Sequence, residues 1–395
     1  MREAVAPTVR RWKGGTKAWT DSSNWEPAGV PGFGDAIEVA SGVCLASNFF
    51  RCASLAMTGG ALKVGTQASS LLEEVLVQVD GDLTLSGKAT LDVSARSNTR
   101  GGCLTVAGNL SLGGTCAMTV CAGPTNGVDR THATGTGFVA VGGNFAVGGS
   151  SVVKPTSSPW TGGSVVFSVG RTFSLSADAK FVTAELGWAR EPSLVPNTHC
   201  PGAGNSYTIG GGYGGCGWGA NATYGNAYGF ANAPIHPGAP KGAYYYERAG
   251  AGLVRIHAAR VELDGTVDCS SAGSWPGAPS GGGIWITGRD HLAVGASAVL
   301  TARGGMNTNY KSEGGGGRIA LGVGLDDADL DELAATGELR RLKPSRVYGV
   351  EAFTNGLYRG VSVDVRCGRE TMDGVHSGTF RFLDARRNGF MFLLR

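Results

Sequence analysis

Hydrophobic residues recur along this chain in pairs separated by one position, and a second pair starts six residues after the first. The four units that share this pattern are Val77-x-Val79 with Leu83-x-Leu85, Leu104-x-Val106 with Leu110-x-Leu112, Val139-x-Val141 with Phe145-x-Val147, and Phe167-x-Val169 with Phe173-x-Leu175. Alternation with a period of two predicts β-strands with one buried face. The units start 27, 35 and 28 residues apart, so the spacing inside a unit is constant while the connections vary. This combination predicts strands that stack in register.

A glycine followed by a polar residue separates the two pairs of every unit. These dipeptides are Gly81-Asp82, Gly108-Asn109, Gly143-Asn144 and Gly170-Arg171. Glycine, Asn and Asp tolerate the left-handed backbone conformations that turn a chain sharply. We therefore expect a left-handed corner between the two strands of each unit.

The pattern resumes downstream. The first pairs are Val254-x-Ile256, Ile284-x-Ile286 and Ile319-x-Leu321, and the first two are followed by Val261-x-Leu263 and Leu292-x-Val294. The gap between Phe167 and Val254 is 87 residues, or one unit plus an insertion that we place at about 190–250. This insertion is rich in glycine and tyrosine.

Two all-β architectures fit these strands. One is a sandwich of short antiparallel strands. The other is a right-handed parallel β-helix, or β-solenoid, of about seven or more rungs. Repetition of the same inward positions at the same offset favours the solenoid, because stacking in register requires it.

The solenoid pattern occupies residues 71–325, and the segments on either side differ from it. Residues 1–70 contain Trp12, Trp19 and Trp25, and an open stack of strands needs its first edge protected. Residues 326–395 begin with a helix over 326–339, which is acidic at its start and is followed by arginines. They end with a hairpin over 378–395, with Asn388-Gly389 as its turn. We expect these C-terminal elements to cover the other end.

Composition excludes several classes of function. The chain has 67 glycines in 395 residues, 16% charged residues and a net charge of +3, with no basic run of the kind that nucleic acid requires. Its apolar stretches are too short to span a membrane. The sequence indicates no cofactor, since the insertion has few carboxylates for calcium and the nine cysteines contain no CxxC pair for zinc. Cys103 and Cys116 are expected to be buried thiols, and Cys200 and Cys216 are close enough in sequence to form a loop-closing disulfide.

The glycine-rich segments carry a family resemblance. Gly281-Gly-Gly-Ile284-Trp285-Ile286, Ala302-Arg-Gly-Gly305 and Gly314-Gly-Gly-Gly-Arg318-Ile319-Ala320-Leu321 resemble the glycine-rich right-handed β-helix repeats of large secreted, autotransporter-like bacterial surface proteins. The tryptophans of residues 12–35 resemble the leading segment of such proteins, and the resemblance implies that this segment forms a cap over the first edge of the stack. The resemblance implies an extracellular or cell-surface location and a role as a spacer, an adhesin or a glycan-contact surface. It implies no catalytic residues, because solenoids carry both adhesins and enzymes.

One candidate site lies on the outward positions of the downstream rungs. If Val254 and Ile284 point inward, then Arg255, His257 and Trp285 point outward, and Arg255 lies about 4.8 Å from Trp285 on the adjacent rung. A tryptophan face for a sugar ring beside an arginine for a carboxylate would contact an acidic glycan. The alternative is that Trp285 packs under the C-terminal helix or the insertion.

The second functional reading is a polysaccharide lyase. Such an enzyme needs a base to remove the proton beside a uronic acid carboxylate, and a positive group to neutralise that carboxylate. His257, Tyr244, Tyr245, Tyr246, Arg248 and Arg255 could supply this set, or they could be surface residues of an ordinary rung. A hydrolase would need two carboxylates, and the nearest group, Glu262, Asp264 and Asp268, is expected to be solvated.

Overall fold

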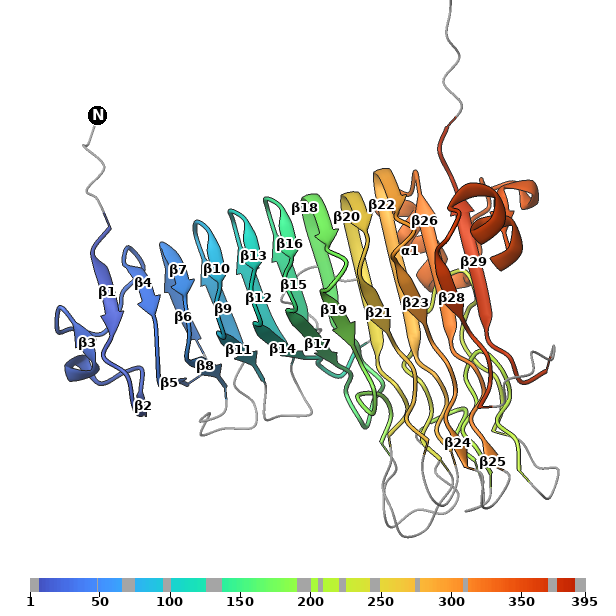
Figure 1. The fold of residues 1–395 in the computed structure, drawn as a ribbon, viewed down its shortest axis with the longest axis horizontal. Coiled ribbons are helices and arrows are strands. Elements are labelled where there is room, and N and C mark those ends of the chain that lie inside the picture. The colour runs from blue at the N-terminus through green and yellow to red at the C-terminus, as the bar shows by residue number, and fades with distance from the viewer. Residues whose placement is uncertain are drawn as a thin grey trace, which may run out of the picture.

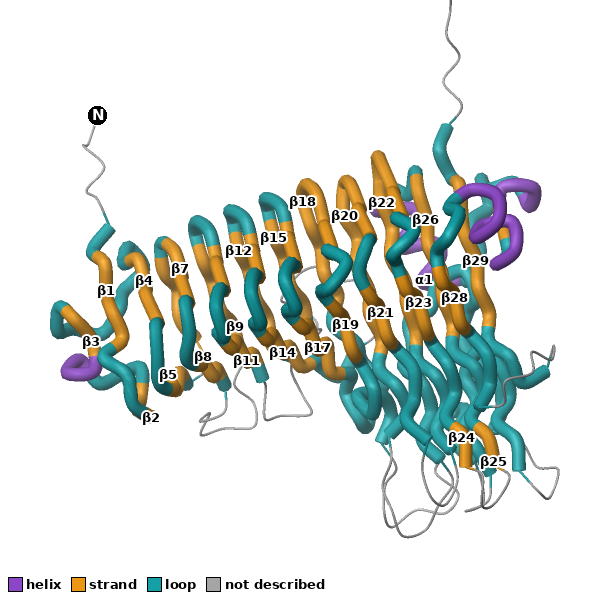
Figure 2. The backbone as a smooth tube through the Cα atoms, viewed as in Figure 1, coloured by secondary structure: helices purple, strands orange, loops and turns teal. Residues whose placement is uncertain are grey.

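The chain forms two long β-sheets that run side by side through a solenoid-like stack of strands (Figures 1 and 2). This computed structural model describes residues 7–47, 49–65, 75–94, 101–125, 137–189, 200–204, 209–219, 225–241, 249–273, 278–307, 312–368 and 375–387. Within them, one sheet has 17 strands, the second has 10, and a small third sheet has two. None of the helices in these ranges is both long and apolar enough to cross a membrane.

The strands of the first sheet are β1 (Val9–Trp12), β3 (Trp25–Glu26), β4 (Ala36–Val39), β6 (Phe49–Cys52), β7 (Ser54–Met57), β9 (Val75–Val79), β10 (Leu83–Leu85), β12 (Gly102–Val106), β13 (Leu110–Leu112), β15 (Phe138–Val141), β16 (Phe145–Val147), β18 (Val166–Leu175), β20 (Leu253–Leu263), β22 (Gly283–Val294), β26 (Arg318–Val323), β27 (Val347–Tyr348) and β29 (Thr379–Asp384).

The strands of the second sheet are β2 (Thr16–Ala18), β5 (Val43–Ala46), β8 (Ala61–Val64), β11 (Thr90–Val93), β14 (Ala117–Cys121), β17 (Val152–Thr156), β19 (Lys180–Val182), β21 (Thr266–Asp268), β23 (Val299–Thr301) and β28 (Ser362–Asp364). The third sheet pairs β24 (Met306–Asn307) with β25 (Ser312–Glu313). The helices are η1 (Ser22–Asn24), α1 (Asp327–Thr336), η3 (Pro344–Arg346) and the π-helix η4 (Ala352–Leu357).

Parallel pairing in register confirms the stacking expected from the repeated pairs. The second pairs form one continuous row, in which the partners are Leu83, Leu110, Phe145, Phe173, Val261 and Leu292. The first pairs of the upstream units are likewise aligned. These inward side chains meet those of the second sheet, as when Phe181 of β19 packs edge-on against Phe167 at 5.5 Å. The two sheets therefore share one core.

The pairing between the last upstream unit and the first downstream unit differs from the expected register by two residues. Phe167 pairs with Ile256 rather than with Val254, and Val169 pairs with Ala258. Val254, Ile256 and Ala258 all point to the same buried face of β20. Either register therefore places apolar residues in the core. The second pairs are aligned as expected, with Phe173 beside Val261, and the register shifts between Val169 and Thr172.

The corners use glycine for a different reason from the one expected. None of Gly81, Gly108, Gly143 and Gly170 has a positive φ, so left-handed corners were a wrong expectation. These glycines are instead stacked so closely that a side chain has no room. A Cβ on Gly81 would lie 2.7 Å from the carbonyl oxygen of Ala53.

Polar side chains connect successive corners. The Asn109 amide N–H donates to Asp82 Oδ1 at 2.7 Å, the Asn144 amide N–H donates to Asn109 Oδ1 at 2.9 Å, and the Thr172 amide N–H donates to Asn144 Oδ1 at 3.2 Å. The Asn and Asp residues therefore satisfy amides that the corner would otherwise leave unpaired. This ladder holds one rung in register with the next.

At the N-terminal end, the three tryptophans are buried and pack together. Trp25 lies edge-on to Trp12 at 5.1 Å and to Trp19 at 4.8 Å, and Trp19 stacks on Phe50 at 4.4 Å. Strand β1 pairs with β4 on one side and antiparallel with β3 on the other. The end strand of this sheet thus has its free edge covered along part of its length.

The C-terminal elements differ in part from expectation. Helix α1 lies close to its expected range, with Asp326 as its N-cap and Gly337 in the left-handed conformation at its end. It covers an outer face of the stack rather than its end. The end is covered instead by η4, whose Phe353 packs on Phe380 and Phe382 at 4.9 and 5.3 Å.

The prediction of a C-terminal hairpin over 378–395 is wrong for its first strand, which pairs differently from the way we expected. Strand β29 pairs in parallel with β26, so that Phe380 lies beside Ile319, and it therefore extends the stack. Its antiparallel partner is β27, which precedes it in the chain. The Asn388-Gly389 turn lies outside the described residues.

Glycine-rich segments form a bundle beside the longer downstream rungs (Figure 2). We define this glycine bundle as residues 209–218, 278–283, 302–305, 314–317 and 375–378. Gly210, Gly211 and Gly212 donate their amides to three different segments, at Trp218 (3.1 Å), Ala278 (2.9 Å) and Gly202 (2.8 Å). The insertion is therefore hydrogen-bonded into the fold through its backbone.

None of the nine cysteines, all of which lie in described segments, forms a disulfide. The Cys200–Cys216 disulfide that the sequence allowed is therefore not formed in this structure. Cys103 and Cys116 are buried thiols, as expected. The backbone hydrogen bonds of the glycine bundle hold the segment around Cys216, whose amide donates to Val375 O at 3.0 Å.

Candidate functional site

The outward residues of β20 and β22 are brought together as the sequence indicated. Arg255 and Trp285 are direct register partners, and the guanidinium carbon of Arg255 lies 5.4 Å from the centre of the indole ring. His257 meets Trp285 edge-on at 4.8 Å, and its Nδ1 is 2.8 Å from Thr287 Oγ1. The Arg255 guanidinium also donates to Ser164 Oγ at 3.1 Å.

This group is covered, so the expectation of an open strand face is wrong. Arg255 and Trp285 are 0% exposed and His257 is 7% exposed. Trp285 packs in an apolar cluster with Leu330 and Leu333 of α1 and with Ala233 of the insertion. The alternative, that Trp285 packs under the helix and the insertion, is the one observed. The physical reason is that a large apolar indole gains most by being removed from water.

The remaining candidates are separated from this group or lie beyond the described residues. Tyr244, Tyr245, Tyr246 and Arg248 all fall in 242–248, outside the described residues. Glu262 and Asp264 are exposed, as expected of a solvated face.

A small pocket lies beside His257. It has a volume of about 140 Å³ and is lined in part by His257, Thr287, Arg289 and Asp327. Pockets that bind small molecules usually measure roughly 300–1,000 Å³. This one is large enough for water or a small group, but not for a polysaccharide chain in the observed arrangement.

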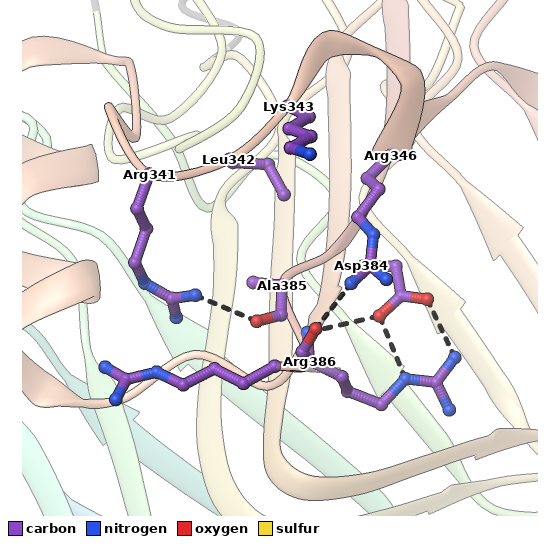
Figure 3. Close-up of a pocket in the computed structure, with 8 residues that line it drawn as sticks. Arg341, Leu342, Lys343, Arg346, Asp384, Ala385 and Arg386 are labelled. Atoms are coloured by element: carbon purple, nitrogen blue, oxygen red, sulfur yellow. Dashed lines mark hydrogen bonds and ion pairs between the residues drawn. The ribbon is translucent and has the colours of Figure 1, made fainter. Parts of the chain in front are cut away.

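A larger pocket lies near the C-terminal end of the stack (Figure 3). Its volume is about 350 Å³, and the charged residues that line it are Arg341, Lys343, Arg346, Asp384, Arg386 and Arg387. We call it the basic pocket. The loop after α1 supplies one wall, and the end of β29 supplies the other. The antiparallel pairing of Val347 with Leu383 brings the two walls together, although they lie some 40 residues apart in sequence.

Arg341 is fixed by several acceptors. Its Nε donates to Asp329 Oδ1 at 2.6 Å and its Nη2 to Asp329 Oδ2. Its Nη groups also donate to the carbonyl oxygens of Ala385 at 2.9 Å and Gly324 at 2.8 Å. The hydrogen bonds to Asp329, and then the negative charge of that carboxylate, raise the pKa of the Arg341 guanidinium. Arg341 therefore joins α1, β26 and β29 and sets the shape of the pocket.

Arg386 is held on the opposite wall by Asp384. Its Nε and Nη2 donate to the two carboxylate oxygens at 2.9 and 2.8 Å, a bidentate pair. Arg346 donates to the carbonyl oxygen of Arg386 (Figure 3). The hydrogen bonds from Arg386, and then the charges of Arg386 and Arg346, lower the pKa of Asp384 despite its partial burial. Asp384 is therefore ionised at neutral pH and positions the surrounding cations.

A second cavity adjoins the basic pocket. It has a volume of about 540 Å³, and Leu342 lines both cavities. Its walls mix apolar side chains with polar ones, namely Leu339, Pro344, Val347, Asn232, Glu338 and Arg381. The two cavities together can receive a ligand longer than a single ion.

The sequence reasoning missed the basic pocket. The signal was present in two short segments, Arg340-Arg341-Leu-Lys343 and Arg386-Arg387, each too short to count as a basic run. Only the pairing of β27 with β29 brings them together. Charge clusters of this kind are visible in a sequence only when the strand pairing is known.

Comparisons with known proteins reveal no relative, since no protein-family model, no curated protein and no solved structure matches this chain.

Asp329 is expected to carry part of the pH dependence of stability. Burial alone would raise its pKa, but hydrogen bonds from Arg341 and from the Asp326 amide outweigh this effect, and the pKa lies below 3.8. A carboxyl group whose pKa is lowered by folding stabilises the fold above its unfolded pKa, and this stabilisation is lost as pH falls through the folded pKa. At neutral pH we expect Asp329→Asn to lower the free energy of unfolding by about 1–3 kcal/mol.

Urea denaturation from neutral to acidic pH measures this effect. The wild-type protein should lose stability below a pH of about 3.8, and the loss should be smaller in Asp329→Asn. Asp331→Asn is the matched control, because Asp331 is exposed on the same helix. Identical acid profiles for wild type and Asp329→Asn would contradict the assignment.

Proposed function

We propose that this chain is a right-handed parallel β-helix of about seven or more rungs from a secreted or cell-surface bacterial protein. In this proposal it acts as a non-catalytic spacer or adhesin that carries a glycan-contact surface. The location is supported by the resemblance of its glycine-rich segments to those of secreted surface proteins. The non-catalytic role is supported by the burial of Arg255, His257 and Trp285, which the lyase reading would place in an open groove.

A continuous core supports the role of spacer. One hydrophobic cluster extends from Trp12 near the first strand to Phe382 in β29, with buried side chains from both sheets between them. Interiors packed in this way transmit strain and resist compression. A stack whose rungs are joined by this core and by ladders of hydrogen bonds is suited to holding attached segments at a fixed separation.

A polysaccharide lyase is the second candidate, and one observation favours it. The imidazole of His257 lines a pocket together with Arg289 and Asp327, so that a base and a cation lie close together. A groove for a glycan would have to open before this group could act, because α1 supplies Asp327 and Leu330 to the same pocket.

An ultraviolet absorbance assay with acidic polysaccharides separates the two candidates. A lyase produces an unsaturated uronic acid that absorbs in the ultraviolet. We expect no increase in absorbance on any substrate, because the burial of His257 prevents it from reaching a sugar. An increase that His257→Ala abolishes, and that a fold-preserving surface variant such as Arg340→Gln retains, would contradict the non-catalytic proposal.

A further inference from the structure

We propose that the basic pocket binds the carboxylate or sulfate groups of an acidic polysaccharide. This inference rests on the glycan-contact role proposed above and gives that role a site and a ligand chemistry.

The charges of the pocket favour an anion. Five cationic side chains and one carboxylate line it, a net charge of +4. Two of the cations already have carboxylate partners, since Arg341 pairs with Asp329 and Arg386 pairs with Asp384. Lys343 and Arg387 also line the pocket, and neither forms an ion pair with any described residue. These two cations are therefore available to a ligand.

The walls of the pocket are fixed before any ligand arrives. Arg341 is held by a carboxylate and two backbone carbonyls, and Arg386 is held by a bidentate pair. Arg346 is tied to the backbone at Arg386. A site that is already ordered loses less conformational entropy on binding. The paired residues therefore shape the pocket, and Lys343 and Arg387 make the contacts with the anion.

The neighbouring cavity accommodates the rest of a sugar chain. A sugar ring has apolar C–H faces and a rim of hydroxyl groups. Leu339 and Val347 offer apolar surface, while Asn232 and Glu338 offer hydrogen-bonding groups. Because Leu342 lines both cavities, an acidic group in the basic pocket and a neighbouring ring in the second cavity can belong to one chain.

The same observations disfavour a nucleic acid. A nucleic-acid surface usually combines a basic track along the backbone with aromatic side chains that stack on bases. The residues that line the two cavities include no aromatic side chain, and the whole chain has a net charge of only +3. The positive charge is concentrated in a concave site, which suits discrete acidic groups.

Binding of labelled polysaccharides to the full chain tests the proposal. The probes are polygalacturonate, which carries carboxylates, dextran sulfate, which carries sulfates, and neutral dextran. We expect binding of one or both acidic probes, weakening with added salt, and no binding of dextran. The variant Lys343→Gln/Arg387→Gln should bind at least about tenfold more weakly, because each charged hydrogen bond that is lost costs roughly that factor.

Arg340→Gln is the matched control. It removes a positive charge from the same loop, but Arg340 is 91% exposed, pairs with Glu332 and does not line the pocket. It should keep its affinity within about twofold, as expected of an exposed surface pair. Equal loss in the control and the double variant would overturn the proposal, as would full retention by the double variant. Equal binding of single-stranded DNA would also overturn it.

These outcomes also separate this inference from the proposed function. If the acidic probes bind and the double variant binds them equally well, glycan contact stands and the site assignment fails. If the wild-type protein binds no polysaccharide, both fail. Unchanged thermal unfolding of the double variant shows that a loss of binding is not a loss of fold, because Lys343 and Arg387 are both exposed.

Discussion

Replacing Trp285 with alanine is expected to lower the free energy of unfolding by about 3–5 kcal/mol, as is usual for a buried tryptophan. The side chain is 0% exposed and lies between β22, α1 and the insertion. Its loss would leave a cavity facing Leu330 and Leu333 and would remove the ring against which Arg255 lies. Equilibrium urea denaturation, followed by far-ultraviolet circular dichroism, measures the effect.

An exposed aromatic residue provides the control for Trp285. Phe33 is 63% exposed, so Phe33→Ala should change stability by no more than about 0.5 kcal/mol. If Trp285→Ala instead keeps its stability and loses affinity for a polysaccharide, then Trp285 is a sugar contact on an open face. That result would contradict the assignment of Trp285 to the interior.

Replacing Gly211 with alanine is expected to cost about 3 kcal/mol or more, at the upper end of the range for overpacking. A Cβ at this position would lie 2.6 Å from the carbonyl oxygens of both Ala239 and Pro240. These are backbone atoms of a neighbouring segment packed against the glycine bundle, so they cannot move aside as a flexible side chain would. The amide of Gly211 also donates to Ala278 O, and its carbonyl accepts from Gly315.

Gly349→Ala is the control for this prediction. A Cβ on Gly349 would have no atom within 4 Å, so the substitution should be close to neutral. Thermal unfolding of the two variants makes the comparison directly. Equal melting temperatures would show that the insertion does not need close backbone contact, and that the glycine bundle does not hold it in place.

The sequence predicted those features that repeat. Rows such as Leu83, Leu110 and Phe145 could be aligned because each upstream unit places an apolar residue at the same offset. The short helix after residue 326 was also predicted close to its observed range, because acidic residues at its start and arginines after its end are local signals. The register across the insertion could not be fixed, since Val254, Ile256 and Ala258 fit either alignment.

Features that depend on distant segments were missed. The cover over Trp285 comes from α1 and from residues near 233, and no local pattern indicates that these meet. The glycine bundle was not predicted, because its hydrogen bonds connect segments far apart in sequence. Arg255 and Trp285 were correctly predicted to be neighbours on adjacent strands, but their exposure depends on packing that a strand pattern does not contain.

Crystallisation with a short acidic oligosaccharide is the most direct test of the central proposal, namely that the chain is a non-catalytic solenoid that binds glycans near its C-terminal end. The expected result is an intact oligosaccharide whose acidic group lies between Lys343 and Arg387, with the next sugar ring beside Leu342. The face of β20 and β22 should remain closed over His257. An oligosaccharide bound along that face, or a cleaved product beside His257, would contradict both the proposed role and the proposed site.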